Sequence, residues 1–210
     1  AIVFFAIFLT MSLSAGIKLR YFAALGGIVL VALPLLWMFV MKDYQKARFT
    51  AVFNLEDPTV QMEDGYQQYQ GRISIGSGRL DGTGLFNGTR VANKSVPFQQ
   101  SDYIFSVAGE ELGFIGCSLI LLLLLLFMAK VLHVASTSRD DLGRYICFGF
   151  FGMIALQSVS NIGMCLALLP AMGVTLPFFS AGGSSAACMY LGFGLVQAVY
   201  LRRKESDGMR

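Results

Sequence analysis

The chain has 210 residues, of which 55% are hydrophobic and only 14% are charged, and its mean hydropathy is +0.63. These values exclude an ordinary soluble domain and predict a polytopic membrane protein. The formal net charge of +3 gives no indication of nucleic-acid binding. The 4 cysteines lie far apart in apolar stretches beside a single histidine, which predicts neither disulfides nor a zinc site.

Five apolar segments are predicted to be transmembrane helices: 1–16, 21–41, 112–134, 145–168 and 182–201. Crossing a bilayer takes about 20 residues, so every segment but the first is long enough. The first is short and begins at residue 1, and we interpret the chain as the C-terminal part of a longer protein. Pro34 predicts a kink in the second helix, because proline removes a backbone donor.

Basic residues in the short links predict the orientation of these helices. They lie between the first two segments, between the third and fourth, and after the last: Lys18, Arg20, Lys130, His133, Arg139, Arg144, Arg202, Arg203 and Lys204. The positive-inside rule makes this side cytoplasmic, including the tail 202–210. Segments 42–111 and 169–181 are then extracytoplasmic. Aromatic and aliphatic residues in 42–111 favour short interfacial helices over disorder.

The link between the last two spans is unusually rich in residues that break helices. Residues 170–185 contain two prolines and three glycines, which argues against a continuous helix. Irregular backbone at membrane depth is tolerated where it is buried in protein or lines a cavity. One interpretation of 169–181 is therefore a re-entrant element beside a cavity, and the other is a plain tight turn.

Three carboxylates, Asp102, Glu110 and Glu111, precede the third long apolar segment. Acidic groups at the edge of a membrane are costly unless they are capped or used. Asp102 is a candidate general base near the interface, where partial desolvation raises its affinity for a proton. The alternative is that Asp102, like Ser101, caps the helix that follows. Glu110 and Glu111 are interpreted as charges at the start of that helix.

Basic and glycine-rich residues in 42–88 suggest an anion site. Lys46 and Arg48 follow the second span, where they either contact lipid headgroups or clamp a pyrophosphate, a task that suits the planar fork of arginine. Gln70 and Arg72 open a glycine-rich stretch that can cradle an anion. That stretch matches no nucleotide-binding motif. Residues 145–201 contain no ionisable Asp, Glu, Lys, Arg or His, which disfavours ion-coupled transport.

Several blocks, in this order, resemble the RodA/FtsW/SpoVE family of cell-shape, division and sporulation proteins, the SEDS glycosyltransferases. The first blocks are DYQKAR at 43–48, NLEDP at 54–58, GYQ through QGRISIGSG within 65–78, and NGT at 87–89. The most specific are DYIFSVAGEELG at 102–113 and, within 161–185, NIGM followed by LPFFSAGGSS. Three positions depart from the family pattern: Phe98 and Gln100 replace its Glu and His, and Ala181 replaces its Tyr.

The resemblance implies an all-α bundle of about ten transmembrane helices, of which this chain holds about five. It implies an inverting peptidoglycan glycosyltransferase that polymerises lipid II at the outer face of the bacterial cytoplasmic membrane. Asp102 aligns with the family's essential aspartate and is the predicted catalytic base. The predicted substrate-binding residues are Lys46, Arg48, Gln70, Arg72, Ser180, Ser184 and Ser185. The predicted supporting residues are Glu110, Glu111 and Asn161.

The implied partners are a class B penicillin-binding protein, lipid II, the glycan on undecaprenyl pyrophosphate and membrane lipids, with no nucleic acid. A divalent cation, Mg²⁺ or Mn²⁺, is a candidate cofactor, and no nucleotide or organic cofactor is expected. Two alternatives remain: a lipid II flippase, and a non-catalytic scaffold of the cell-wall synthesis complex. The block at 73–78 resembles RodA somewhat more, while elongation, division and sporulation all stay open.

Overall fold

The computed structural model describes the backbone of residues 2–207 and the side chains of residues 2–202, and this part of the chain contains no strand. The tail beyond, including the side chains of Arg203 and Lys204, lies outside the described residues. Five long helices are present: α1 (Ile2–Ser14), α2 (Leu19–Leu35), α7 (Ile104–Ser136), α8 (Asp141–Cys165) and α9 (Gly183–Asp207). Four short helices lie between them: α3 (Asp43–Phe53), α4 (Pro58–Met62), α5 (Tyr66–Ser77) and α6 (Thr89–Ala92).

Within the described part of the chain, four helices are long and apolar enough to cross a membrane: Leu19–Val40, Ile104–Ser136, Asp141–Cys165 and Gly183–Arg202. The shorter α1 is also apolar. The five predicted apolar segments are therefore helices, and the chain is a polytopic all-α membrane protein. Pro34 lies inside α2, and a π-helical turn, Leu36–Val40, follows directly where the kink is predicted.

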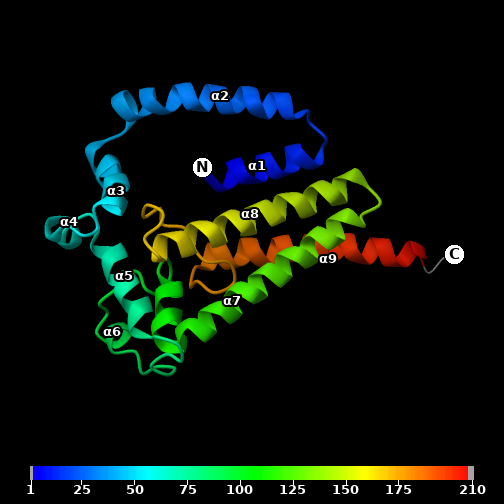
Figure 1. Cartoon of the computed structure of the whole chain (residues 1–210). Coiled ribbons are helices and arrows are strands. Elements are labelled where there is room, and N and C mark those ends of the chain that lie inside the picture. The colour runs from blue at the N-terminus through cyan, green and yellow to red at the C-terminus, as the bar shows by residue number, and fades with distance from the viewer. Residues whose placement is uncertain (1, 208–210) are drawn as a thin grey trace.

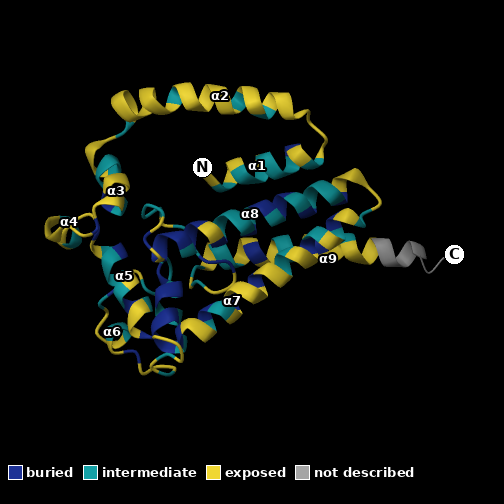
Figure 2. Ribbon diagram, in the orientation of Figure 1, coloured by how far each residue is buried: buried dark blue, intermediate teal, exposed yellow. Residues whose placement is uncertain are grey.

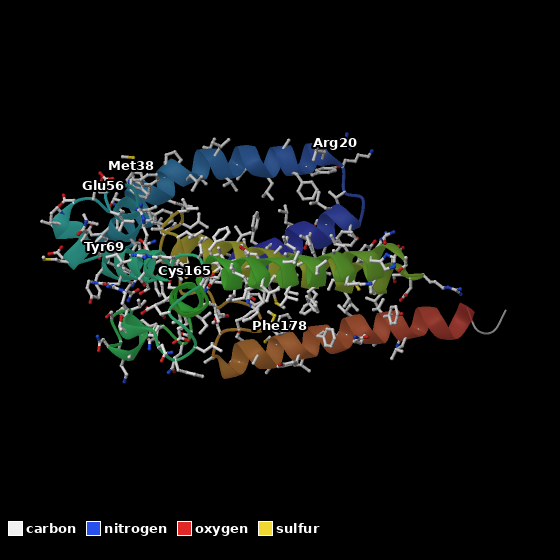
Figure 3. All side chains as sticks on the ribbon, turned by 60° about the horizontal axis from the view of Figure 1, so that its bottom comes forward. Arg20, Met38, Glu56, Tyr69, Cys165 and Phe178 are labelled. Carbon is white, nitrogen blue, oxygen red and sulfur yellow. The ribbon has the colours of Figure 1, made fainter. Side chains whose placement is uncertain are left out.

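Helix α8 forms the centre of the bundle, with α1, α7 and α9 packed against it (Figure 1). Glycine lets α1 approach closely, because a Cβ at Gly152 would lie 2.3 Å from Oγ1 of Thr10. Helix α2 stands apart, and none of its residues is buried (Figure 2). The short helices gather at one end of the bundle, where Glu56 and Tyr69 lie, and Arg20 lies at the opposite end (Figure 3).

Helix α7 begins at Ile104 and not near residue 112, so residues 104–112 of the predicted outer segment are helical. A break at Gly113 separates them from the apolar part of the helix. Gly113 has φ +66° and ψ −164°, a conformation that is essentially restricted to glycine. The predicted start of the third span at 112 therefore corresponds to this break.

The loop at 79–84 pairs the backbone groups that the break would leave without partners. Four hydrogen bonds do so: Thr83 N to Glu110 O at 2.9 Å, Gly84 N to Glu111 O at 3.0 Å, Phe114 N to Arg79 O at 2.9 Å, and Ile115 N to Leu80 O at 3.2 Å. The approach is close, since a Cβ on Gly113 would lie 2.3 Å from the nitrogen of Gly82. We call this set of bonds the Gly113 clasp.

The link between α8 and α9 is a long non-helical loop at 166–182, which rules out a plain tight turn. Leu176 and Pro177 are buried in it. Leu176 joins a cluster of buried apolar side chains with Tyr103, Phe105 and Met164. The link therefore packs against the start of α7, and its predicted re-entrant position in the membrane stays a prediction.

Replacing Gly113 with alanine tests the clasp. We expect Gly113→Ala to lower stability by about 1–3 kcal/mol from backbone strain alone, with a further loss as the added methyl pushes the loop away. The matched control is Gly194→Ala in α9, where a Cβ meets nothing within 4 Å and little change is expected. The measurement is the thermal unfolding midpoint of each purified variant in detergent. Equal midpoints for the two variants would contradict the clasp.

Candidate active site

Asp102 lies in a tight turn, 98–103, immediately before α7. The carbonyl of Phe98 accepts hydrogen bonds from the backbone N–H groups of Ser101, Asp102 and Tyr103 at 3.1, 3.1 and 3.3 Å. Phe98 itself has a φ of +54°, in the left-handed region that non-glycine residues rarely occupy. Strain of this kind persists where surrounding contacts hold it, and it is commonly found at functional sites.

Asn161 ties this turn to the link. It is fully buried on α8, and its Nδ2 donates to the carbonyl oxygens of Asp102 and Val174, each at 2.7 Å. One amide group therefore fixes the backbone of Asp102 against both α8 and the link. Asn161 thus supports the turn structurally, and its role in the reaction stays a prediction.

The link makes two further bonds to the same turn. Ser180 Oγ donates to the carbonyl of Ser101 at 2.6 Å and accepts from the N–H of Leu176 at 2.8 Å. The N–H of Ala181 donates to the carbonyl of Gln100 at 2.9 Å. Of the serines predicted to bind substrate, the structure thus brings Ser180 against the turn, where it bonds to protein.

The other two serines lie further along. Ser185 Oγ is 2.8 Å from Oγ1 of Thr175, so it closes the link upon itself. Ser184 is exposed at the start of α9. Their predicted contact with substrate stays a prediction.

The carboxylate of Asp102 is half-buried and forms no hydrogen bond or ion pair with any described residue. Gly173 lies beside it, because a Cβ built on Gly173 would be 3.5 Å from Oδ2 of Asp102. The backbone of Asp102 is therefore held on several sides while its carboxylate stays available. A helix cap would instead accept a backbone N–H bond from the first turn, and the helix shows no such side-chain cap.

Tyr103 reports on the electrostatics around Asp102. Burial raises the pKa of its hydroxyl most, the charge of Asp102 raises it further, and the charge of Arg48 lowers it. Arg48 and Asp102 therefore act on the same group, although 53 positions of sequence separate them on α3 and the 98–103 turn. Arg48 and Asp102 thus both lie within electrostatic range of Tyr103, and the role of Arg48 as a pyrophosphate clamp stays a prediction.

The remaining predicted binding residues lie on α3 and α5. Lys46 is half-buried and Arg72 is exposed, and neither side chain bonds to another described residue. Gln70 differs, because its Oε1 accepts a hydrogen bond from the guanidinium of Arg90. Arg90 also donates from Nε to Ser74 Oγ at 3.1 Å.

Glu110 and Glu111 lie inside α7, not at its start as predicted, because the helix begins at Ile104. Both are buried. Oε1 of Glu110 accepts from the backbone N–H of Arg90 at 2.8 Å, so the carboxylate anchors α6 to α7. A contact of this kind is consistent with the supporting role predicted for Glu110.

Arg90 and Gln68 are the residues that sequence reasoning missed. Nε2 of Gln68 donates to the carbonyl of Leu169 at 2.6 Å and joins α5 to the link. The only signal for them in the sequence is their location: Gln68 lies within the block at 65–78, and Arg90 directly follows the NGT block at 87–89. Their partners are distant in sequence, so spacing alone did not identify them.

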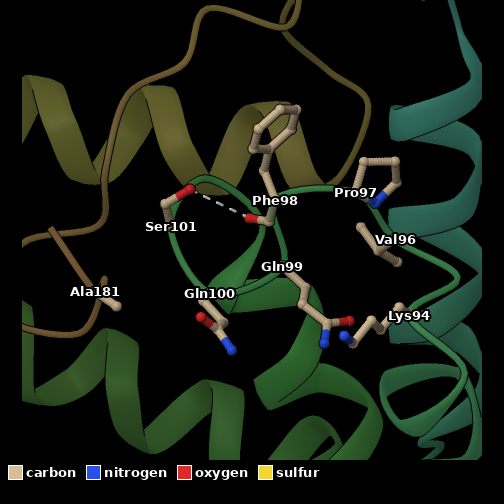
Figure 4. A pocket seen from close by; sticks show the side chains of 8 residues that line it. All are labelled: Lys94, Val96, Pro97, Phe98, Gln99, Gln100, Ser101 and Ala181. Atoms are coloured by element: carbon tan, nitrogen blue, oxygen red, sulfur yellow. Dashed lines mark hydrogen bonds between the residues drawn. The ribbon is translucent and has the colours of Figure 1, made fainter.

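A pocket of about 450 Å³ opens beside the 98–103 turn (Figure 4). It is lined by Lys94, Val96, Pro97, Phe98, Gln99, Gln100, Ser101 and Ala181. All three departures from the family pattern, Phe98, Gln100 and Ala181, lie on its wall. An aromatic ring beside amide, hydroxyl and ammonium groups suits a polar ligand with an apolar face.

A divalent cation near Asp102 would need several oxygen ligands. The described residues contain no group of three or more His, Cys, Asp or Glu that could hold a metal ion. Mg²⁺ is commonly held by one or two carboxylates together with substrate phosphates. Asp102 is a single carboxylate, so the predicted cation fits only together with a phosphate-bearing substrate.

Removing the amide of Asn161 tests its hold on the turn. Asn161→Ala leaves two carbonyls without their donor, at a cost of about 1–3 kcal/mol each. We expect a lower unfolding midpoint and faster amide hydrogen exchange in 98–103 and 171–176. The control is Ser158→Ala on the same helix, whose buried hydroxyl bonds to no described residue. Unchanged exchange in both segments would refute this role of Asn161.

Comparison with known proteins identifies the family. The family model described as cell cycle protein, which covers FtsW, RodA and SpoVE, matches residues 1–205. Peptidoglycan glycosyltransferase MrdB of Escherichia coli strain K12 is 37% identical over 181 residues, which are 85% of this chain and 48% of MrdB. Stage V sporulation protein E of Bacillus subtilis is 36% identical over 183 residues, 87% of this chain and 48% of that protein.

A probable peptidoglycan glycosyltransferase FtsW of Geobacter sulfurreducens is 35% identical over 196 residues, 92% of this chain and 51% of its own length. The chain thus spans about half the length of the curated relatives it matches. A solved structure described as structural coordination of polymerization and crosslinking by a peptidoglycan synthase complex superposes with a TM-score of 0.76 and 27% identity, over 97% of this chain and 55% of that one. The chain belongs to the FtsW/RodA/SpoVE family of cell cycle proteins.

Proposed function

We propose that this chain carries the catalytic base of a peptidoglycan glycosyltransferase that polymerises lipid II. The names of its relatives support the activity. The observation that carries the proposal is the state of Asp102, whose backbone is held by Asn161 and whose carboxylate has no partner among the described residues. A carboxylate whose backbone is fixed, and whose oxygens form no hydrogen bond within the protein, is suited to accept a proton from a substrate.

The chemistry requires one base. Asp102 takes the proton from the 4-hydroxyl of the acceptor sugar as that oxygen attacks the anomeric carbon of the donor. The new glycosidic C–O bond forms as the bond from the anomeric carbon to the lipid pyrophosphate breaks, with inversion. The leaving pyrophosphate is already a stable anion, so the second carboxylate that glycosidases use as general acid is not needed.

The charge of the leaving pyrophosphate is balanced by Arg48. Its charge acts on Tyr103, the chain neighbour of Asp102. Guanidinium groups bind phosphate oxygens in pairs and stabilise charge where it develops. A divalent cation, where bound, would be held by the pyrophosphate oxygens and would add a further positive charge there, on the face of the anomeric carbon opposite to Asp102. Lys46, Arg72, Ser184 and the pocket beside the turn are proposed to contact the rest of the substrate.

Orientation and partner complete the proposal. The end that carries the short helices faces outward from the cytoplasmic membrane, and the opposite end, with Arg20 and the C-terminal tail, faces the cytoplasm. Lipid II presents its sugars on the outward side, near Asp102. The similar solved complex couples polymerization with crosslinking, which supports a class B penicillin-binding protein as the partner that crosslinks the strands.

Exchanging the carboxylate for an amide tests the base. We expect Asp102→Asn to lower the polymerisation rate by about 10²–10⁴-fold, the usual contribution of a general base. The measurement is the length and yield of glycan strands formed from lipid II, resolved on gels, with folded protein and its partner. The control is Asp64→Asn, an exposed carboxylate on the loop after α4, which should retain the wild-type rate.

Three outcomes would contradict the proposal. Full polymerisation by Asp102→Asn would exclude this residue as the base. Transport of labelled lipid II across vesicles without any polymer would favour the flippase, and support of cell-wall synthesis by Asp102→Asn in cells would favour the scaffold.

A further inference from the structure

Five exposed apolar side chains surround the break in α7. They are Leu80, Leu85, Phe86, Phe114 and Ile115. Between 61% and 91% of each is exposed, and Phe86 is the most exposed of the five. We call this set the apolar rim. Large apolar side chains gathered on a polar loop usually mark a binding surface.

The apolar rim has three residues on the loop (Leu80, Leu85 and Phe86) and two on α7 (Phe114 and Ile115). The Gly113 clasp joins these two parts. The N–H of Ile115 donates to the carbonyl of Leu80, and the N–H of Gly84 donates to the carbonyl of Glu111. The loop carrying Leu85 and Phe86 is thereby held beside the first residues of the apolar part of α7. Since that part of α7 spans the membrane, the clasp places the loop at the level where the span begins (Figure 1).

The loop also holds its apolar groups outward at a conformational cost. Phe86 has a φ of +62°, in the left-handed region, and its ring is 91% exposed. In water, the left-handed backbone and the exposed phenyl ring would both cost free energy, because exposing apolar surface to water is unfavourable. An apolar environment around the ring would offset this cost. Arg79 and Asp81 are exposed on the same loop, as expected for side chains at headgroup level.

We propose that the apolar rim inserts into the lipid leaflet at this end of the bundle, with acyl chains around Leu80, Leu85 and Phe86. The loop is then a membrane anchor for the segment outside the bundle. Helix residues 104–112 connect the clasp directly to Asp102, so the anchor sets the height of the 98–103 turn above the bilayer. This inference depends on α7 spanning the membrane and is independent of the proposed glycosyl transfer.

Depth-dependent fluorescence tests the anchor. The chain has a single tryptophan, Trp37, so Trp37→Phe, together with replacement of any tryptophan in the rest of the longer protein, provides a silent background for Phe86→Trp. The protein is reconstituted in phosphatidylcholine nanodiscs with or without brominated acyl chains. Insertion by about 5–10 Å should bring the indole close to the bromines and lower its emission about twofold. The matched control is Asp64→Trp on the polar loop after α4, where no quenching is expected.

Leu85→Trp gives a second reading should Phe86→Trp fold poorly, and both should resist quenching by aqueous iodide. Quenching of the rim tryptophans by iodide and not by brominated lipid would overturn the proposal, since the loop would then lie in water. Resistance to both quenchers would also overturn it, since another protein surface would then cover the rim.

Discussion

The structure depends on pairing the backbone where α7 breaks. Inside or at the edge of a membrane, a helix that stops leaves N–H and C=O groups without water to bind, and each such group is costly. The loop at 79–84 supplies partners on both sides of Gly113. Because the backbone groups at the break are hydrogen-bonded in this way, the helix can change direction at Gly113, and residues 104–112 pack against α5. The position of everything before them, including Asp102, follows from that change of direction.

A second constraint acts on the other side of Asp102. Asn161, Ser180 and the backbone of Ala181 bind the 98–103 turn to α8 and to the link. The turn is therefore clamped between the link and the first part of α7. The bonds all engage the backbone, and the carboxylate has no partner among the described residues, which suits the role proposed for it. Such preorganisation allows a single base to suffice when the leaving group needs only charge balance.

Much of the fold could be predicted from the sequence, because runs of about 20 apolar residues indicate membrane helices directly. The true start of α7 could not, since Glu110 and Glu111 make 104–112 resemble a polar loop. Both residues are buried; one carboxylate oxygen of Glu110 accepts from the N–H of Arg90, and the clasp bonds the backbone carbonyls of both residues. The motifs made Asp102 and Asn161 candidates, and their functional roles stay predictions. The hydrogen bond from Asn161 to the carbonyl of Asp102 became visible only in the structure. Contacts between segments far apart in sequence leave no periodic pattern, so the remaining parts of the site required the structure.

The central claim is that the carboxylate of Asp102 meets the acceptor hydroxyl. The most direct measurement is an electron cryomicroscopy map of the protein in a nanodisc with a lipid pyrophosphate disaccharide analogue and an acceptor glycan bound. We predict that the acceptor 4-oxygen lies about 2.6–3.2 Å from a carboxylate oxygen of Asp102, the distance at which a base takes a proton. An acceptor oxygen held by a different carboxylate, with Asp102 facing away from the sugars, would contradict the account.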